Sequence, residues 1–260
     1  MKYQEFPILE HDPTRKAIIE PSELVEPADV PARCVICFFQ EVIKGLLEAG
    51  SLRHIVDSKS ESGPHPLYTF EFQGESLALF HPGVGAPSAA ALLEEVIARG
   101  CRAFIACGSA GVLNSEIALG HLIVPTEAIR DEGTSYHYLP PSRAVAASPS
   151  AVRAIEQVLT RHKVPYLLGK TWTNDGIYRE TPDKVKLRRE EGCLAVEMEA
   201  AAVSAVARFR KVVMGQILYG GDDVGSSEWD GRAWAQQTSV REKLFWLAAE
   251  AALALEPEGL

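Results

Sequence analysis

Residues 193–203, CLAVEMEAAAV, join a short apolar run to an alanine-rich segment through two carboxylates. The apolar run has the length of a buried strand and alanine is a strong helix former, so the stretch is predicted to be a strand that leads directly into a helix. Asp and Glu are almost never fully buried without partners, so Glu197 and Glu199 need a reason to stand at this junction. Either they meet the positive end of the helix dipole, or they hold a polar ligand at the end of the strand.

The same alternation of strands and helices continues along the chain in both directions. Predicted strands cover residues 34–39, 67–72, 76–83, 102–108, 121–126, 165–173, 193–196 and 212–220. Predicted helices cover residues 41–50, 87–99, 148–162, 181–191, 197–210 and 237–254. This pattern, without repeats or an obvious linker, predicts a single α/β domain over residues 34–260 with a mixed, twisted central sheet flanked by helices. Residues 1–33 contain five prolines and little periodicity, so we expect an extended N-terminal arm.

Composition narrows the possible partners. The chain has 260 residues and a net charge of −9, without an acidic tail. Such a surface repels nucleic-acid phosphates and anionic lipids, so we expect a small-molecule ligand or a protein partner, with no nucleic acid and no membrane. The start of the chain lacks signal-peptide character and no apolar run could span a bilayer, which predicts a cytoplasmic protein. The odd number of cysteines, five, indicates reduced thiols. The CxxC of residues 34–37 has no second pair to complete a metal site, so no metal is predicted and these cysteines are expected in the core.

Small or polar residues follow five of the predicted strands. They are residues 83–88, 108–111, 173–176, 197–199 and 221–223. In α/β sheets, ligands bind outside the carboxyl ends of the strands. One Gly-rich turn is an ordinary structural feature, but five such strand ends together indicate a ligand site at this edge of the sheet.

The motifs at these positions resemble those of the nucleoside phosphorylase-I family. The resemblance rests on GVGAPS, ACGSAG, AIRDEGTSYHYLPP, TWTNDGIYRET, AVEMEAAAV and the strand ending in GGDD, in the family's order and spacing, over roughly residues 77–225. The stretch RDEGTSYHYLPP is similar to the uridine-phosphorylase branch in particular. The resemblance implies the nucleoside phosphorylase-like α/β fold and cleavage of the N-glycosidic bond of a nucleoside. It also implies no cofactor, with inorganic phosphate as a possible co-substrate, and a homo-oligomer, either a hexamer or a dimer.

The resemblance assigns roles to the acidic residues. In the family, the residues that match Glu197, Met198 and Glu199 hold the ribose. Carboxylate hydrogen bonds to the sugar hydroxyls strengthen as the departing ribosyl group becomes oxocarbenium-like. Asp222 lies 23 positions after Glu199 and matches the family's purine-protonating aspartate, which makes it the candidate general acid. The adjacent Asp223 could serve instead, and pyrimidine-specific members do not use an aspartate there.

The acceptor side of the site departs from the family pattern. Ser109 matches the Ser or Thr that touches the acceptor and the ribose, and Gly108 and Gly85 are expected to line the same pocket. Where phosphorylases of the family carry two phosphate-binding arginines, this chain has Ala106 and Glu41. Losing both removes the bidentate donors that phosphate normally needs.

Two acceptors are therefore open. In the nucleosidase branch, a glutamate in the place of Glu41 activates water, so the chain could be a hydrolytic nucleosidase. Glu41 could also be only an acid near a helix start. Against hydrolysis, Arg33, Arg130 or a neighbouring subunit's arginine could rebuild a phosphate site. Phosphorolysis is therefore the first expectation and hydrolysis the alternative.

The base and the 5′ end are less defined. Ile177, Tyr178 and Asp223 are the candidate lining of the base pocket. Thr181 and Asp183 stand where uridine phosphorylases have the Gln and Arg that read uracil, so uridine is not supported.

The N-terminal arm contributes one further candidate. His11 matches the histidine that some family members lend to a neighbouring subunit's 5′-hydroxyl, although a lone histidine in an irregular arm is more often a solvated surface residue. With the phosphate arginines and the base pocket both altered, a non-catalytic nucleoside-binding module stays open as a further alternative.

Overall fold

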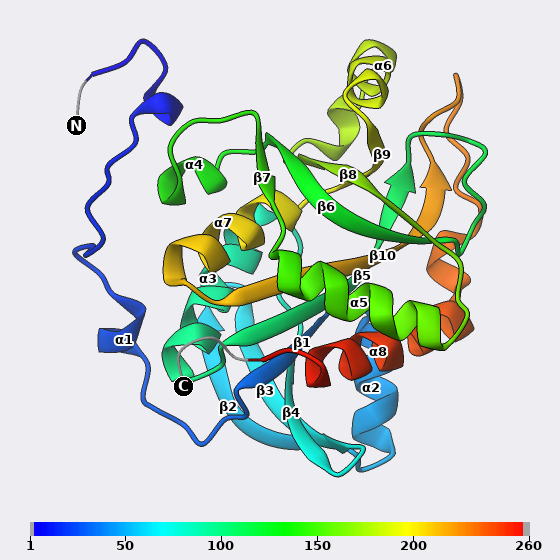
Figure 1. The fold of residues 1–260 in the computed structure, drawn as a ribbon. Helices are drawn as coiled ribbons and strands as arrows, with labels where there is room; N and C mark the ends of the chain where they lie inside the picture. Colours follow the sequence, from blue (N-terminus) through cyan, green and yellow to red (C-terminus); the bar gives the residue numbers. More distant parts are fainter. Residues whose placement is uncertain (1–2, 257–260) are drawn as a thin grey trace.

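Ten strands form one mixed sheet in the computed structural model, which describes residues 3–256 (Figure 1). The strands are β1 (Arg33–Cys37), β2 (Arg53–Ser60), β3 (Gly63–Phe72), β4 (Glu75–Phe80), β5 (Ala103–Val112), β6 (Leu122–Asp131), β7 (Ala144–Ala146), β8 (Tyr166–Asn174), β9 (Cys193–Glu197) and β10 (Val213–Asp223). The α-helices are α1 (Pro21–Leu24), α2 (Gln40–Glu48), α3 (Ala86–Arg99), α4 (Ser135–Tyr138), α5 (Pro149–Arg161), α6 (Pro182–Glu190), α7 (Ala200–Arg210) and α8 (Thr238–Leu253). Three 3₁₀ turns accompany them in the described part, η1 (Pro7–Leu9), η2 (Ile177–Arg179) and η3 (Trp234–Gln236). The predicted mixed α/β fold is confirmed.

The sheet combines two parallel groups of strands. Strands β4, β1, β5 and β10 are parallel to one another, and so are β6, β8 and β9. The groups meet antiparallel at two places, β10 with β6 and β9 with β5. Because β10 also pairs with β5, the strands β5, β10, β6, β8 and β9 form a closed ring. Closure leaves these five strands without a free edge, which fixes their ends relative to one another.

Helices cover both faces of the parallel strands. Val35 and Cys37 of β1 point into a core shared with α2, α5 and α8. Cys34 and Ile36 point into the opposite core, shared with α3 and α7. Alternate residues of a strand face opposite sides, so a strand buried on both faces reads as a continuous apolar run. This explains the CVIC run and confirms that Cys34 and Cys37 are core residues with free thiols.

Three strands extend well beyond their predicted ends, and one of them is β6, which continues to Asp131 instead of ending at residue 126. The small residues 108–111 were expected in a turn, but β5 continues to Val112, and β10 continues to Asp223. These extensions stay paired with each other, with Ser109 opposite Tyr219 and a register shift between Gly220 and Asp223. Strands β2 and β7 were not predicted. Strand β2 is largely exposed at the sheet's edge and β7 has three residues, so neither carries an apolar pattern.

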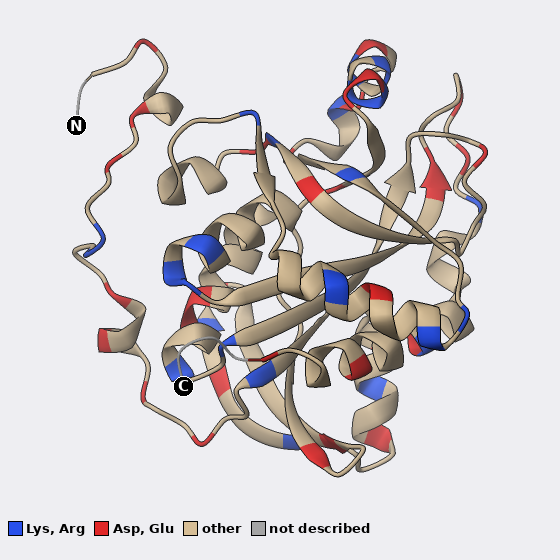
Figure 2. Ribbon diagram, viewed as in Figure 1, with Lys and Arg blue, Asp and Glu red and all other residues tan. Residues whose placement is uncertain are grey.

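The N-terminal residues run along one side of the molecule before they enter β1 (Figure 1). Within residues 3–32 they hold η1 and α1, and Arg99 of α3 donates to the carbonyl of Glu26 at 3.0 Å. Residues 1–2 of the expected arm and residues 257–260 of the expected domain lie outside the described residues. Basic and acidic side chains are interspersed over the elements, and α6 carries many of both signs (Figure 2). No helix among residues 3–256 has the length and apolar character needed to cross a bilayer.

Gly215 tests the packing of the sheet against α5. A Cβ at Gly215 would lie 2.7 Å from the Cβ of Ala151, so Gly215→Ala should push α5 off β10 and lower the free energy of unfolding by about 1–3 kcal/mol. Gly45→Ala is the matched control, because Gly45 is exposed on α2 and a Cβ there meets nothing within 4 Å. It should stabilise the fold by about 0.5–1 kcal/mol. Urea unfolding of both variants measures the difference, and equal midpoints would contradict it.

Candidate functional site

Glu197, the last residue of β9, is buried and its carboxylate is fully engaged inside the protein. Its Oε1 accepts hydrogen bonds from the hydroxyls of Thr173 (2.7 Å) and Thr171 (3.4 Å). Its Oε2 accepts the backbone N–H groups of Glu199 (2.7 Å) and Ala200 (2.6 Å), at the start of α7. Burial raises the pKa of Glu197, and the bonds from Thr173 and the backbone oppose that shift. The geometry therefore gives Glu197 the helix-start role, with no free oxygen turned to a ligand.

Glu199, two residues later, points to a different partner. Its Oε1 accepts the backbone N–H of Gly85 (2.6 Å), in the loop between β4 and α3. Its Oε2 accepts only a long bond from the N–H of Met198 (3.3 Å). Burial, reinforced by the charge of Glu197, raises the pKa of Glu199 to about 8. The structure thus brings together Glu199 and Gly85 and leaves one Glu199 oxygen with weak internal bonding, beside the half-buried Met198.

The two aspartates at the end of β10 have separate environments. Asp223 is buried, forms an ion pair with Arg232 (2.7 Å) and accepts the N–H of Gly225 (2.8 Å). Asp222 is half-buried and accepts the indole N–H of Trp229 (2.7 Å). A Cβ at Gly111 would lie 3.5 Å from Asp222 Oδ1, so the glycine leaves room for this carboxylate against β5. Of the two, Asp222 has the carboxylate that is available to a ligand.

Glu180 is an acidic residue that the sequence did not single out. It follows η2 and accepts a hydrogen bond from the side-chain amide of Asn174 at 3.4 Å. Burial raises the pKa of Glu180 to about 7, and the nearby charge of Asp222 adds to the increase. The ends of β8 and β10 therefore present two carboxyl groups to one region. The sequence offered no signal for this pairing beyond the acid's place in the TWTNDGIYRET motif.

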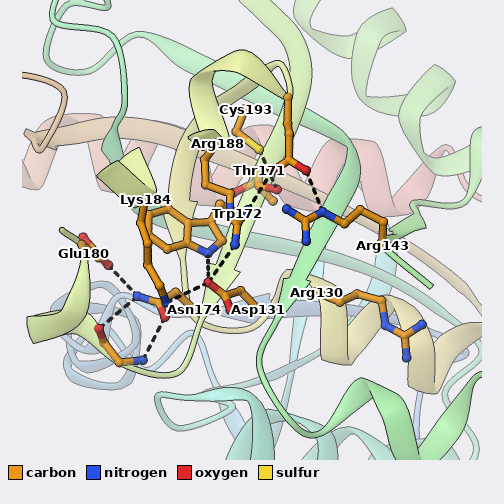
Figure 3. A network of polar contacts seen from close by, with 12 residues as sticks. Arg130, Asp131, Arg143, Thr171, Trp172, Asn174, Glu180, Lys184, Arg188 and Cys193 are labelled. Carbon is orange, nitrogen blue, oxygen red and sulfur yellow. Dashed lines mark hydrogen bonds and ion pairs between the residues drawn. The ribbon is translucent and has the colours of Figure 1, made fainter. Parts of the chain in front are cut away.

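A polar network anchors the segment that carries Glu180 (Figure 3). Asp131 Oδ2, at the end of β6, accepts bonds from Trp172 Nε1 (3.0 Å), Lys184 Nζ (3.2 Å) and Arg188 Nη2 (3.1 Å). Burial would raise the pKa of Asp131, but the two cations outweigh it and the pKa is lowered. Three elements, β6, β8 and α6, are thereby tied together, and α6 fixes the position of the preceding turn.

The expected base pocket is open on this side. Ile177 and Tyr178 in η2 are 54% and 94% exposed, so they do not enclose a ligand within this chain. His11 lies in the N-terminal arm, where its Nδ1 is buried without a hydrogen-bond partner among the described residues. The arm passes its own chain's β6–α4 loop, with Ile8 near Gly133. The roles expected for Ile177, Tyr178 and His11 stay predictions.

The residues expected to bind the acceptor, phosphate or water, lie around Ser109. Its hydroxyl lies beside the phenol of Tyr219, its partner in the β5–β10 register. The Tyr219 Oη accepts a hydrogen bond from Arg241 Nε (2.9 Å), and Arg241 Nη1 donates to Glu41 Oε1 (2.6 Å). Gly108 lies in β5, next to the residue that follows β1, since a Cβ at Gly108 would be 3.3 Å from the ring of Phe38. Ser109, Gly108 and Glu41 are therefore brought together, and an arginine that the sequence analysis did not select joins them.

The arginines considered from the sequence are engaged elsewhere. Arg33 Nε donates to the carbonyl of Leu255. Arg130 is buried and donates to Ser135, Ser142 and two carbonyls of the loop after α4. These partners all lie away from Ser109, and Ala106 is a core residue on the α3 and α7 side. Arg241 escaped the sequence analysis because it is one of several charged residues in a helix with ordinary spacing.

Among residues 3–256, no three His, Cys, Asp or Glu side chains lie together so as to hold a metal ion. The site consists of carboxylates, one arginine, hydroxyls and backbone N–H groups.

Comparisons with known proteins identify the family and the fold of the chain. The model of the phosphorylase superfamily matches residues 32–251. A guanosine phosphorylase from Halorubrum lacusprofundi is 28% identical over 158 residues, 61% of this chain and 66% of that protein, so the match spans just under two thirds of the relative.

Two solved structures share the fold. An AMP nucleosidase from Bacteroides thetaiotaomicron superposes with a TM-score of 0.67 at 24% identity, over 86% of this chain and 87% of the other. A uridine phosphorylase from Vibrio fischeri superposes with a TM-score of 0.71 at 23% identity, over 87% of this chain and 91% of the other.

The raised pKa of Glu199 predicts a pH-dependent stability. Unfolding returns the carboxyl to its ordinary value near 4.5, whereas the folded state keeps the proton up to about pH 8. The folded state thus binds more protons between these values, and its stability falls as the pH rises through them. Glu199→Gln should flatten this decline by up to about 1.4 kcal/mol per pH unit. Urea unfolding at pH 5.5 to 8.5 measures the slopes, with Glu71→Gln on the exposed side of β3 as control. An unchanged slope in Glu199→Gln would contradict the assignment.

Proposed function

Because the chain belongs to the phosphorylase superfamily, we propose that it cleaves the N-glycosidic bond of a nucleoside by phosphorolysis, to a free base and a pentose 1-phosphate. The observation that carries the proposal is the buried Glu199 carboxyl, held by the N–H of Gly85 at the meeting point of β9 and the β4–α3 loop. A buried carboxyl with a weakly bonded oxygen is suited to a neutral polar group such as a sugar hydroxyl.

Glu199 acts on the ribose in this proposal. As the C1′–N bond breaks, the sugar gains positive charge, which favours the ionised carboxylate over the protonated form. The interaction is therefore stronger in the transition state than with the bound nucleoside, as catalysis requires. Glu197 is a positioning residue, since its carboxylate holds the start of α7 and hence the backbone of Glu199.

Asp222 acts on the leaving base. It gives a proton to the ring nitrogen as the C1′–N bond breaks, while a phosphate oxygen forms the new bond to C1′. Glu180 supplies a second carboxyl group in this region, since burial and the charge of Asp222 raise its pKa to about 7. This acid pair suits a base that leaves protonated on a ring nitrogen, as purines do.

Inorganic phosphate is the proposed co-substrate, and no other cofactor is needed. Glu41 is paired with Arg241, so the acceptor side carries no bare negative charge to repel the anion. Hydrolysis is the second candidate, favoured by the half-exposed Glu41 carboxylate, which Arg241 and Tyr219 link to Ser109, and by Ala106 where a phosphate arginine is expected. Assembly into a homo-oligomer, dimer or hexamer, stays part of the proposal.

Product analysis distinguishes the two acceptors. The purified protein is incubated with purine and pyrimidine nucleosides and 5′-monophosphates, with and without phosphate. We expect free base and pentose 1-phosphate that form only with phosphate, and purine nucleosides as the better substrates. Free pentose released at the same rate without phosphate supports hydrolysis instead, and then Glu41→Gln should abolish turnover. No release of base from any compound contradicts both.

Asp222 and Asp223 should separate chemistry from stability. Asp222→Asn should lower turnover by about 100-fold or more, the usual range for losing a general acid, with the fold intact. Asp223→Asn removes the closer and more buried of the two ion-pair partners of Arg232 and should lower the free energy of unfolding by about 2–4 kcal/mol, with turnover largely retained. Steady-state kinetics and urea unfolding test both variants. The reverse pattern would make Asp223 the acid.

A further inference from the structure

Arg241 is a buried arginine at the site that belongs to none of the sequence motifs of the family resemblance. It comes from α8, which packs against β1, β5 and β10 and lies outside every motif that defines the resemblance (Figure 1). Its side chain is 9% exposed, a rare degree of burial for an arginine without a function or a saturated set of partners.

The guanidinium is fixed in orientation. Its carbon Cζ lies 5.3 Å from the ring centroid of Phe39, 5.2 Å from that of Trp234 and 5.9 Å from that of Tyr219. Nε donates to Tyr219 Oη (2.9 Å) and Nη2 donates to the carbonyl of Trp234 (3.3 Å). A planar cation enclosed by aromatic faces keeps its position when a charged partner leaves.

The charged partner, Glu41, is the more exposed half of the pair. Its side chain is 40% exposed and Arg241 is the partner that the structure gives it, at 2.6 Å. Rotation of Glu41 into solvent restores its hydration at little cost, because a partly exposed ion pair contributes little net stability. A guanidinium has five N–H donors, of which three are engaged here, and departure of Glu41 leaves three free.

Ser109 places this cation at the reaction site. Ser109 of β5 and Tyr219 of β10 are paired in the sheet, and their hydroxyl groups lie next to each other. The Oη of Tyr219 accepts a hydrogen bond from Arg241. The first turn of α2, which holds Glu41, adds the positive end of a helix dipole on the same side.

We propose that Arg241 and Ser109 form an oxyanion site for inorganic phosphate, in which Glu41 is an internal carboxylate that occupies Arg241 until phosphate displaces it. The site takes the place of the two absent phosphate arginines. Phosphate as the co-substrate rests on the proposed phosphorolysis, but binding of the anion does not require turnover.

The test measures binding of inorganic phosphate to the full chain by isothermal titration calorimetry, without nucleoside. Arg241→Met removes the charge and keeps the length of the side chain, and it should weaken binding by about tenfold or more. Glu41→Gln removes the competing carboxylate and should tighten binding by about tenfold. Arg161→Gln, which breaks an exposed ion pair with Glu250 between α5 and α8, is the matched control and should change nothing. Circular dichroism and urea unfolding establish that each variant is folded.

Opposite effects of the two site variants identify the role, because a purely structural ion pair would lose stability in both and tighten phosphate binding in neither. If Arg241→Met does not fold, Arg241→Lys replaces it, because lysine keeps the positive charge without the paired N–H donors of the guanidinium and should weaken phosphate binding less than tenfold. The tighter phosphate binding expected of Glu41→Gln then remains the deciding measurement. Phosphate binding that is equal in parent, Glu41→Gln and Arg241 variants overturns the site. Nucleoside cleavage without phosphate, together with the opposite effects on binding, would overturn the proposed phosphorolysis and leave the anion site standing.

Discussion

The buried carboxylate of Glu197 is the interaction on which the site depends. One carboxylate joins three parts of the fold: the hydroxyls of β8, the end of β9 and the first N–H groups of α7. Removing a charge from water is costly, and four hydrogen bonds together with the helix dipole offset that cost here. Since β8 and β9 belong to the closed ring of strands, the bond network sets where α7 starts, and the start of α7 sets where Glu199 points.

The site separates its charges by environment. Glu199 is buried where its proton is retained, and the pKa of Glu180, after η2, is raised by burial and by the charge of Asp222 at the end of β10. On the other side of β5, the negative charge of Glu41 is balanced by Arg241. In the proposed reaction, the carboxyl groups act on the sugar and the leaving base, and the cation binds the attacking anion.

The sequence analysis succeeded where local pattern and tertiary environment agree. The apolar runs of β1, β5, β9 and β10 are buried on both faces, so their patterns were clear. Helices α2, α3, α5, α6 and α8 begin within one residue of their predicted positions, and α7 starts three residues later than predicted, whereas the short helices α1 and α4 were not predicted. The sequence analysis failed for elements that form only because they pair with a neighbouring strand. The residues after Gly108 look like a turn but remain a strand because β10 pairs beside them, and β2 is a polar strand that exists because β3 holds it.

The sequence by itself determined the class of the fold, the family and the set of acidic residues, because strand and helix periods and motif spacing are local properties of the chain. Through the family resemblance it assigned both Glu197 and Glu199 to the ribose, and it left open which of Asp222 and Asp223 is the acid. Only the tertiary structure decided that Glu197 starts α7, that Glu199 turns to Gly85 and that Asp223 is bound to Arg232. The meeting of Glu41 with Arg241 joins residues 200 positions apart in the chain, and such a pairing follows from packing α8 across the sheet, which no local pattern contains.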